Sequence, residues 1–167
     1  MPVIRISKVV VVAAVALYAT LVAFGNITDY GSNFAFVQHV LMMDTIFPDA
    51  TITYRAIANP IAHHSAYVLI IAAEVGTALA CWIGAAQMFS RRGASASAFN
   101  HAKGWAIAGL TFGFIVWQVG FMTIGGEWFG MWMSSTWNGI QSAFRVFIMI
   151  LGALIYIAMP DGEISNA

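Results

Sequence analysis

Long, nearly uninterrupted runs of apolar residues dominate the pattern of hydrophobic and polar positions along this chain. Four such runs cover 9–25, 65–89, 104–124 and 140–159. A helix needs roughly 17 to 25 mostly apolar residues to cross about 30 Å of hydrocarbon. Because a chain in lipid must satisfy its own backbone hydrogen bonds, helices are favoured over open strands. The pattern therefore predicts an all-α, polytopic membrane protein, a bundle of four transmembrane helices forming one membrane domain over 1–167.

The composition agrees with a surface that faces lipid. The chain is 60% hydrophobic and only 8% charged, whereas soluble domains carry about 25% charged residues. The net charge is zero, so no nucleic-acid partner is expected. The single cysteine, Cys81, excludes a cysteine-based zinc site and is expected to be a small core residue. The expected partners are the bilayer and either another membrane protein or a second copy of the chain, and no cofactor is expected.

Basic residues predict the orientation, because lysine and arginine gather on the cytoplasmic side of membrane proteins. The first run also resembles a signal peptide, but no clean small-residue cleavage site follows it, so we expect an uncleaved helix. Both termini are then cytoplasmic in a multi-pass protein of a bacterial inner membrane. Five basic residues fall on the cytoplasmic side (Arg5, Lys8, Arg91, Arg92, Lys103) and two on the outer side (Arg55, Arg145).

The segments between the runs differ in character. The outer segment 26–64 is too long for a tight turn. Helical spacing predicts a short interfacial helix from Phe34 to about Thr45, capped by Ser32 or Asn33 and ended by Pro48. The segment 90–103 is small, polar and basic, which predicts a flexible cytoplasmic connection.

Three tryptophans lie in the second outer segment, 125–139. Tryptophan rings settle at the headgroup level, so an aromatic belt is the first interpretation. An aromatic-lined cleft for a lipid-soluble ligand is the alternative.

Small residues recur on two of the predicted spans. Such residues let membrane helices approach closely, so the second and third spans are expected to be antiparallel neighbours. The second span carries Ala72, Gly76, Ala80 and Gly84, and the third carries Gly109 and Gly113.

One carboxylate, Glu74, falls near the middle of the second span. A charge there is costly unless it is protonated, paired or hydrated. Arg145, about one and a half turns into the fourth span, is within reach, so we expect a Glu74–Arg145 pair. Glu127 or an outer aspartate is the competing partner of Arg145. A pair would fix which helices touch, and the alternative role of Glu74 is a proton or ligand site.

Polar residues of the outer segments are further candidates for a binding site. Clusters of such residues more often supply hydrogen-bond partners to buried polar groups of the loops. His63 and His64 are adjacent, so they point about 100° apart and cannot chelate one ion together as residues i and i+4 would. A haem held by His39 with His63 or His64 is a minor alternative to hydrogen bonding at the interface. No catalytic motif is present. The candidates on the outer side, beside Glu74 and Arg145, are Asp29, Asn33, His39, Asp44, Glu127, Trp128 and Asn138.

Several motifs carry a resemblance to one bacterial family. They are the run 25–37 (GNITDYGSNFAFV), Phe99-Asn100 with Lys103-Gly104-Trp105, and Gly125-Gly126-Glu127-Trp128-Phe129 with Trp137-Asn138-Gly139. The chain resembles the predicted small integral membrane proteins of unknown function from about Val9 to Ile157. The resemblance implies four spans in an inner membrane and carries over no ligand or catalytic residue.

Three functions remain open on these observations. The leading hypothesis is a non-enzymatic accessory or scaffold subunit that docks a partner with its outer segments. The second is a small oligomeric transporter or channel with Glu74 as its intramembrane acidic site. The third is a quinone- or haem-linked redox subunit that uses the outer aromatic residues and histidines.

Overall fold

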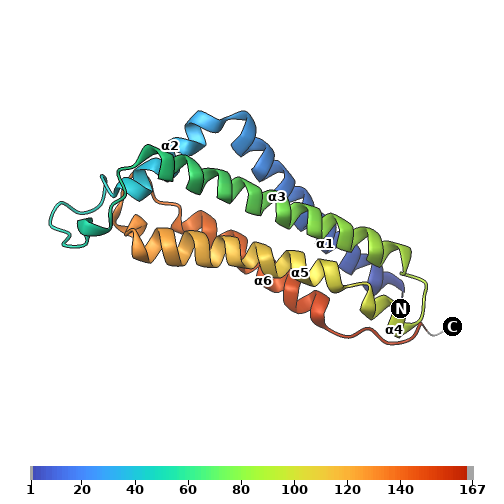
Figure 1. The fold of residues 1–167 in the computed structure, drawn as a ribbon. Coiled ribbons are helices and arrows are strands. Elements are labelled where there is room, and N and C mark those ends of the chain that lie inside the picture. The colour runs from blue at the N-terminus through green and yellow to red at the C-terminus, as the bar shows by residue number, and fades with distance from the viewer. Residues whose placement is uncertain (1, 165–167) are drawn as a thin grey trace.

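Four long helical segments run back and forth along one axis in the computed structural model, which describes residues 2–164 (Figure 1). The first is α1 (Pro2–Thr28) and the second is α3 (Pro60–Ser90). The third combines α4 (Ala96–His101), α5 (Gly104–Phe114) and η2 (Ile115–Trp128), and the fourth is α6 (Ile140–Ala158). All four segments are long and apolar enough to cross a membrane. The predicted all-α bundle is therefore confirmed for the described part of the chain.

The helices extend beyond the apolar runs at several ends. α1 takes in Arg5 and Lys8, and α3 begins five residues before the predicted span. Asn59 caps α3, because its side-chain oxygen accepts a hydrogen bond from the backbone N–H of Ile61 at 2.9 Å. Pro60 occupies the first helical position, where its missing N–H has no intrahelical partner to lose. Local capping chemistry thus sets this boundary.

The order of the helices in the bundle follows from their contacts. α1 packs along α3, α3 along α5, and α6 along α5 and η2, whereas α1 and α6 meet more sparsely. The core between them is apolar, and Cys81 belongs to it as expected. Fully buried members include Val12, Ala16, Cys81, Ala106, Leu110 and Ile150.

The predicted small-residue seam joins α3 to α5, but not every predicted residue takes part in it. A Cβ added at Gly84 would overlap the backbone of Ala106, and one at Gly109 would lie 2.8 Å from the backbone N of Cys81. Ala72, by contrast, is exposed and takes no part in the seam. Because glycine has no side chain, the two backbones come into contact at these positions, and α3 and α5 are close antiparallel neighbours.

The short helix predicted in the first outer segment exists as α2 (Tyr30–Met42), but both of its predicted ends were wrong. Only Asp29 separates it from α1, and Asn33 does not cap it, because its side chain donates to the carbonyl oxygen of Asp29. The helix ends at Met42, because the next residue, Met43, has a left-handed φ of 53° and caps the helix through its backbone N–H on the Val40 carbonyl oxygen. The Met43 side chain is 4% exposed and packs in the core, well before Pro48. A short 3-10 turn, η1 (Thr53–Arg55), follows in the loop.

The connection 90–103 is more ordered than predicted. Ser95 caps α4 by accepting from the backbone N–H of Ala98, and Phe99 is fully buried. A buried aromatic side chain gives a short helix a tertiary anchor, which the polar composition alone does not reveal.

The third segment changes character at Ile115, where η2 takes π-helical geometry. The backbone N–H of Phe129 bonds to the carbonyl oxygen of Ile124 at 3.0 Å, a spacing of five residues. Such geometry usually lasts one turn, and here it extends over 14 residues. It carries the third segment into the region predicted as a loop, where η3 (Met131–Met133) follows.

The close packing of α3 against α5 can be tested by substitution at the seam. Gly84→Ala is expected to destabilise the bundle by about 2 kcal/mol, because the new methyl group forces two backbones apart. Gly152→Ala on α6 is the matched control, since a Cβ there meets nothing within 4 Å. Unfolding in mild detergent measures both, and equal stability of the two variants would contradict the close approach.

Candidate functional site

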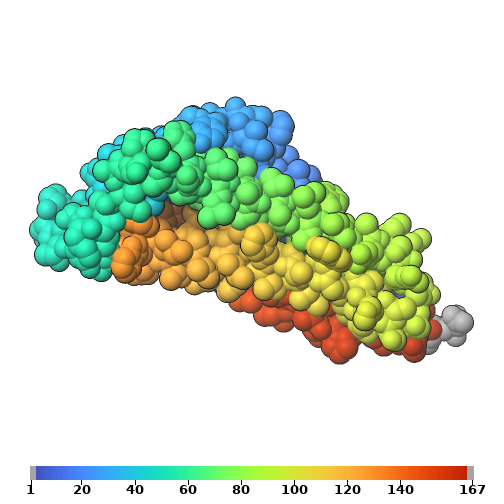
Figure 2. Space-filling view, in the orientation of Figure 1, coloured from blue at the N-terminus to red at the C-terminus, as the bar shows by residue number. Residues whose placement is uncertain are grey.

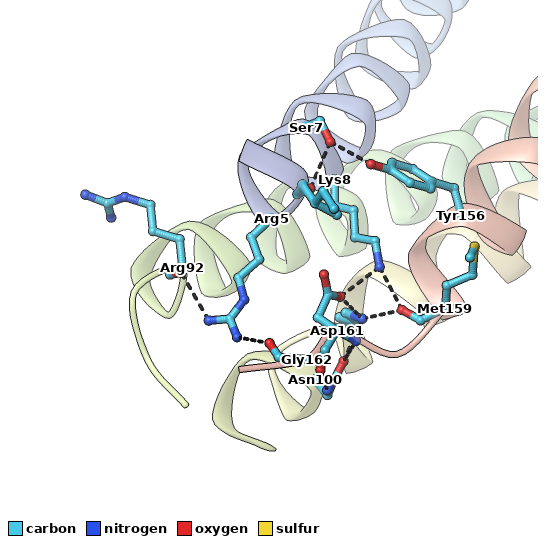
Figure 3. Close-up of polar contacts among 11 residues, drawn as sticks. Arg5, Ser7, Lys8, Arg92, Asn100, Tyr156, Met159, Asp161 and Gly162 are labelled. Carbon is cyan, nitrogen blue, oxygen red and sulfur yellow. Dashed lines mark hydrogen bonds and ion pairs between the residues drawn. The ribbon is translucent and has the colours of Figure 1, made fainter. Parts of the chain in front are cut away.

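Charged side chains from distant parts of the chain meet at the end of the bundle where α1 begins and the segment after α6 ends (Figure 3). Lys8 Nζ lies 2.7 Å from Asp161 Oδ2, and Lys103 Nζ binds the same oxygen. The three side chains are only 3–6% exposed. We call Arg5, Lys8, Asn100, Lys103 and Asp161 the basic cluster.

Asn100 and a backbone carbonyl complete this network. The carbonyl oxygen of Met159 accepts from Lys8 at 2.7 Å and from Lys103 at 2.8 Å. Asn100 Oδ1 accepts from Lys103 Nζ and from the backbone N–H of Asp161, while its Nδ2 donates to the Asp161 carbonyl oxygen. The segment after α6 is thereby fixed against α1 and the α4–α5 junction.

Arg5 is held differently from the two lysines. Its guanidinium is 1% exposed and donates to three carbonyl oxygens, those of Arg92, Ala94 and Gly162. It also lies over the ring of Phe99, 4.8 Å from the centroid. Carbonyl oxygens satisfy its donors without neutralising its charge. Within residues 2–164, Asp161 is the only carboxylate that ion-pairs in the cluster, against three cations.

The charge state of Asp161 follows from these neighbours. Burial alone would raise the pKa of its carboxyl group, but hydrogen bonds and charges from Lys103 and Lys8 outweigh burial and lower that pKa below its ordinary value. Asp161 is therefore ionised at neutral pH and acts as the shared counter-ion of both lysines.

Sequence reasoning used Arg5, Lys8 and Lys103 only to predict orientation, and it missed Asn100 and Asp161. Two signals were present. Asp161 is an acidic residue directly after the fourth span, and Asn100 and Lys103 sit together in one of the motifs that carried the family resemblance.

Glu74 forms a second polar site, inside the bundle. It is 1% exposed, and Asn26 Nδ2 donates to its Oε2 at 2.7 Å. The Tyr67 hydroxyl in turn donates to the carbonyl oxygen of Asn26 at 2.9 Å. The site therefore joins the last turn of α1 to α3.

The predicted Glu74–Arg145 pair was wrong. Arg145 is exposed on α6 and has no ion pair with a carboxylate anywhere in residues 2–164. α3 packs against α1 and α5, and α6 lies beyond α5, so the face of Glu74 meets α1. The similar depth of Glu74 and Arg145 along the membrane axis suggested that they pair. The order of helices around the bundle, however, decides which residue Glu74 meets.

The outer candidates do not form one cluster. His39 Nδ1 lies 2.8 Å from Asp44 Oδ2, and the His39 ring stacks on Trp137 at 4.6 Å. Asn138 is a local capping residue, since it accepts from the backbone N–H of Ile140 and donates to the Trp132 carbonyl oxygen. Asp29 and Glu127 are exposed.

The adjacent histidines have separate partners, as their angular offset predicts. His63 is buried, with Nε2 2.7 Å from the carbonyl oxygen of Ile57. His64 bonds to the Tyr30 hydroxyl through Nδ1 and stacks on Phe34 at 4.1 Å. Both histidines fix α3 to outer elements.

Trp128 is paired with Arg55. The guanidinium lies 4.5 Å from the centre of the indole ring, and its Nη1 donates to the Trp128 carbonyl oxygen. Trp128 nevertheless remains 52% exposed, so its ring faces outward from the protein.

The basic cluster generates a prediction. Asp161→Asn leaves two buried lysines without their counter-ion, which should cost about 3 kcal/mol of unfolding free energy. Glu163→Gln is the control, because Glu163 is exposed. Unfolding in detergent measures both.

The difference between wild type and Asp161→Asn should also depend on pH. The pKa of Asp161 is lowered by folding, so its stabilisation is present above the unfolded value of about 4 and is lost as pH falls through the lower folded value. The difference should be constant from about pH 5 to 8 and shrink below about pH 4. A difference that grows on acidification would contradict the ion pairing.

Comparisons with known proteins agree with this architecture. A search of curated proteins and a search of solved structures found no match. The family model described as "Predicted small integral membrane protein (DUF2165)" matches residues 4–160, which include all the helical segments except the first two residues of α1. The match also includes the basic cluster except Asp161. The resemblance inferred from the motifs is therefore confirmed, and the chain belongs to this family of small integral membrane proteins.

Proposed function

We propose that the protein is a non-enzymatic accessory subunit of a bacterial inner membrane that docks a partner protein with its outer end. We call residues 43–59 and 128–138 the outer lobe. Figure 2 shows the first of these segments projecting at one end of the molecule, and Figure 1 shows the N-terminus and α4 at the other end. The basic cluster lies at that other end, since Arg5 is near the N-terminus and Asn100 is on α4. The observation that carries the proposal is the set of exposed aromatic side chains that this lobe presents.

The aromatic side chains are held in defined arrangements. Phe47 and Trp132, both 48% exposed, meet edge to face at 5.7 Å. Tyr54 is 76% exposed and lies beside Arg55, which also covers Trp128. Tryptophan, tyrosine and arginine dominate the energetics of protein interfaces. A surface that is already ordered loses less conformational entropy on binding.

The lobe is fixed to the bundle rather than free. Thr45 Oγ1 and Ser134 Oγ lie 2.8 Å apart and join its two segments. The backbone N–H of Ile57 donates to the Leu41 carbonyl oxygen at 2.8 Å. These bonds support a pre-formed docking surface at the outer end.

The proposed orientation places the basic cluster in the cytoplasm and the outer lobe outside. It rests on the positive-inside rule, because Arg5, Lys8 and Lys103 lie in the basic cluster. Arg91 and Arg92 lie at the same end, since they follow α3 directly and Arg5 donates to the Arg92 carbonyl oxygen. Single cysteines introduced at Tyr54 and Arg92 test it. A membrane-impermeant maleimide should label Tyr54→Cys in intact cells or spheroplasts and Arg92→Cys only after lysis. Native Cys81 is fully buried and should remain unlabelled. The opposite pattern would overturn the orientation.

Docking is tested by mild-detergent purification of tagged chain followed by mass spectrometry. Wild type should retain a partner near one-to-one. The double variant Tyr54→Ala, Trp132→Ala should lose at least about tenfold of it, since interface aromatics contribute about 2 kcal/mol or more each. Leu69→Ala is the control, because Leu69 is 70% exposed on α3, away from the lobe. A chain that purifies alone, or a partner retained equally by both variants, would contradict docking through the lobe.

A transporter is the second candidate, because a buried carboxylate lies within a span. Glu74→Gln keeps the acceptor oxygen that Asn26 uses but removes the ability to ionise. Stability should stay within about 1 kcal/mol of wild type, whichever function holds. If Glu74 couples transport, ion flux in proteoliposomes is lost in Glu74→Gln. Flux that survives the substitution would rule out this role.

A further inference from the structure

Two adjoining hollows follow the seam between α1 and α6. The first has a volume of about 310 Å³ and is lined by Ile4, Arg5 and Lys8 of α1 and by Tyr156 and residues 159–163. The second, about 330 Å³, is almost wholly apolar. It is lined by Val11, Ala14 and Val15 of α1 and by Met149, Gly152, Ala153 and Tyr156 of α6. Tyr156 lines both hollows, so they adjoin at its side chain, the first polar at the end of the bundle and the second apolar further in. We call the two hollows together the groove.

The dimensions of the groove fit one leaflet of a bilayer. Ile4 and Val15 mark its two ends on α1, and eleven helical steps of 1.5 Å separate them by about 16 Å. One leaflet of a bilayer of about 40–45 Å, with its headgroup region included, is about 20–22 Å thick, so the whole groove fits within one leaflet. The polar hollow therefore lies at headgroup level when the apolar hollow lies among the acyl chains.

The excess positive charge beside the polar hollow favours binding of an anion there. Arg5 and Lys8 line this hollow, and Lys103 lies behind it; all three are buried. Asp161 pairs with the two lysines, whereas Arg5 has only carbonyl oxygens as partners. Glu163 also lines this hollow, but it is exposed and accepts from the backbone N–H of Ala96. The three cations outnumber the two carboxylates, and excess charge away from water is unfavourable until it is compensated.

The lysine that lines the hollow also retains a donor. An ammonium group has three N–H donors, and Lys8 Nζ uses two, on Asp161 and the Met159 carbonyl oxygen. All three donors of Lys103 are used. Ser7 bonds to the Tyr156 hydroxyl at 2.6 Å and fixes the ring at the boundary between the hollows.

We propose that this groove binds one anionic phospholipid, with its phosphate beside Lys8 and Arg5 and an acyl chain along Val11, Val15 and Gly152. A free phosphate would use only the polar hollow, and a helix of another protein would use only the apolar one. A phospholipid uses both at the observed spacing, and basic pockets between spans suit anionic headgroups. The proposal does not depend on partner docking by the outer lobe.

The test compares two lipids with identical acyl chains, phosphatidylglycerol and phosphatidylcholine, added to delipidated protein in mild detergent. Phosphatidylglycerol should raise the unfolding temperature and bind at least about tenfold more tightly, because binding to the folded state stabilises it. Native mass spectrometry should show one retained molecule. Equal effects of the two lipids would overturn the proposal.

Two matched variants separate groove binding from general charge attraction. Gly152→Leu fills the apolar hollow, and Gly120→Leu adds the same side chain on η2; a Cβ at either site meets nothing within 4 Å. Gly152→Leu should weaken phosphatidylglycerol binding at least about tenfold while Gly120→Leu binds as wild type. Lys8→Gln should reduce the preference for the anionic headgroup.

Each remaining outcome decides against the proposal. If Gly152→Leu and Gly120→Leu bind phosphatidylglycerol equally well, no acyl chain occupies the groove. Glycerol phosphate lacks acyl chains. If it stabilises the protein as much as phosphatidylglycerol does, the site takes a small anion instead.

Discussion

The bundle depends on the pairing of two buried lysines with one carboxylate. Lys8 comes from the first turns of α1, Lys103 from the junction of α4 and α5, and Asp161 from the segment after α6. Each ammonium group is too costly to bury alone, so the three segments must assemble together. Asn100 and the Met159 carbonyl oxygen then fix the geometry. These charges hold together one end of the bundle.

The interior of the bundle follows a different principle. Within lipid, apolar burial does not drive helices together, and close packing and buried hydrogen bonds take its place. Gly84 and Gly109 bring α3 against α5, and the Asn26–Glu74 hydrogen bond brings α1 against α3. α6 completes the bundle against α5 and η2 and leaves the seam with α1 partly open. The groove along that seam is a consequence of this order.

Much of the fold could be predicted from the sequence, because span length, capping residues and small-residue spacing are local signals. The four spans and the α3–α5 seam are of this kind. The partner of Glu74 was not local, since Asn26 lies 48 residues away and the order of helices decides which face it meets. The hydrogen bonds of the basic cluster join positions up to 157 residues apart. Its lysines fitted the orientation rule, so their pairing with a carboxylate was not predicted from the sequence. The end of α2 coincides with the left-handed backbone and the burial of Met43, which only tertiary contacts reveal.

The two ends of the molecule are built for different surroundings. One end buries its charges and opens onto a groove of leaflet depth, whereas the other exposes ordered aromatic side chains. A double-mutant cycle of Lys8→Met and Asp161→Leu, with unfolding free energy as the readout, tests most directly whether the ion pairing holds the bundle. The account predicts a coupling energy above about 1 kcal/mol. Effects that add within about 0.5 kcal/mol would contradict it.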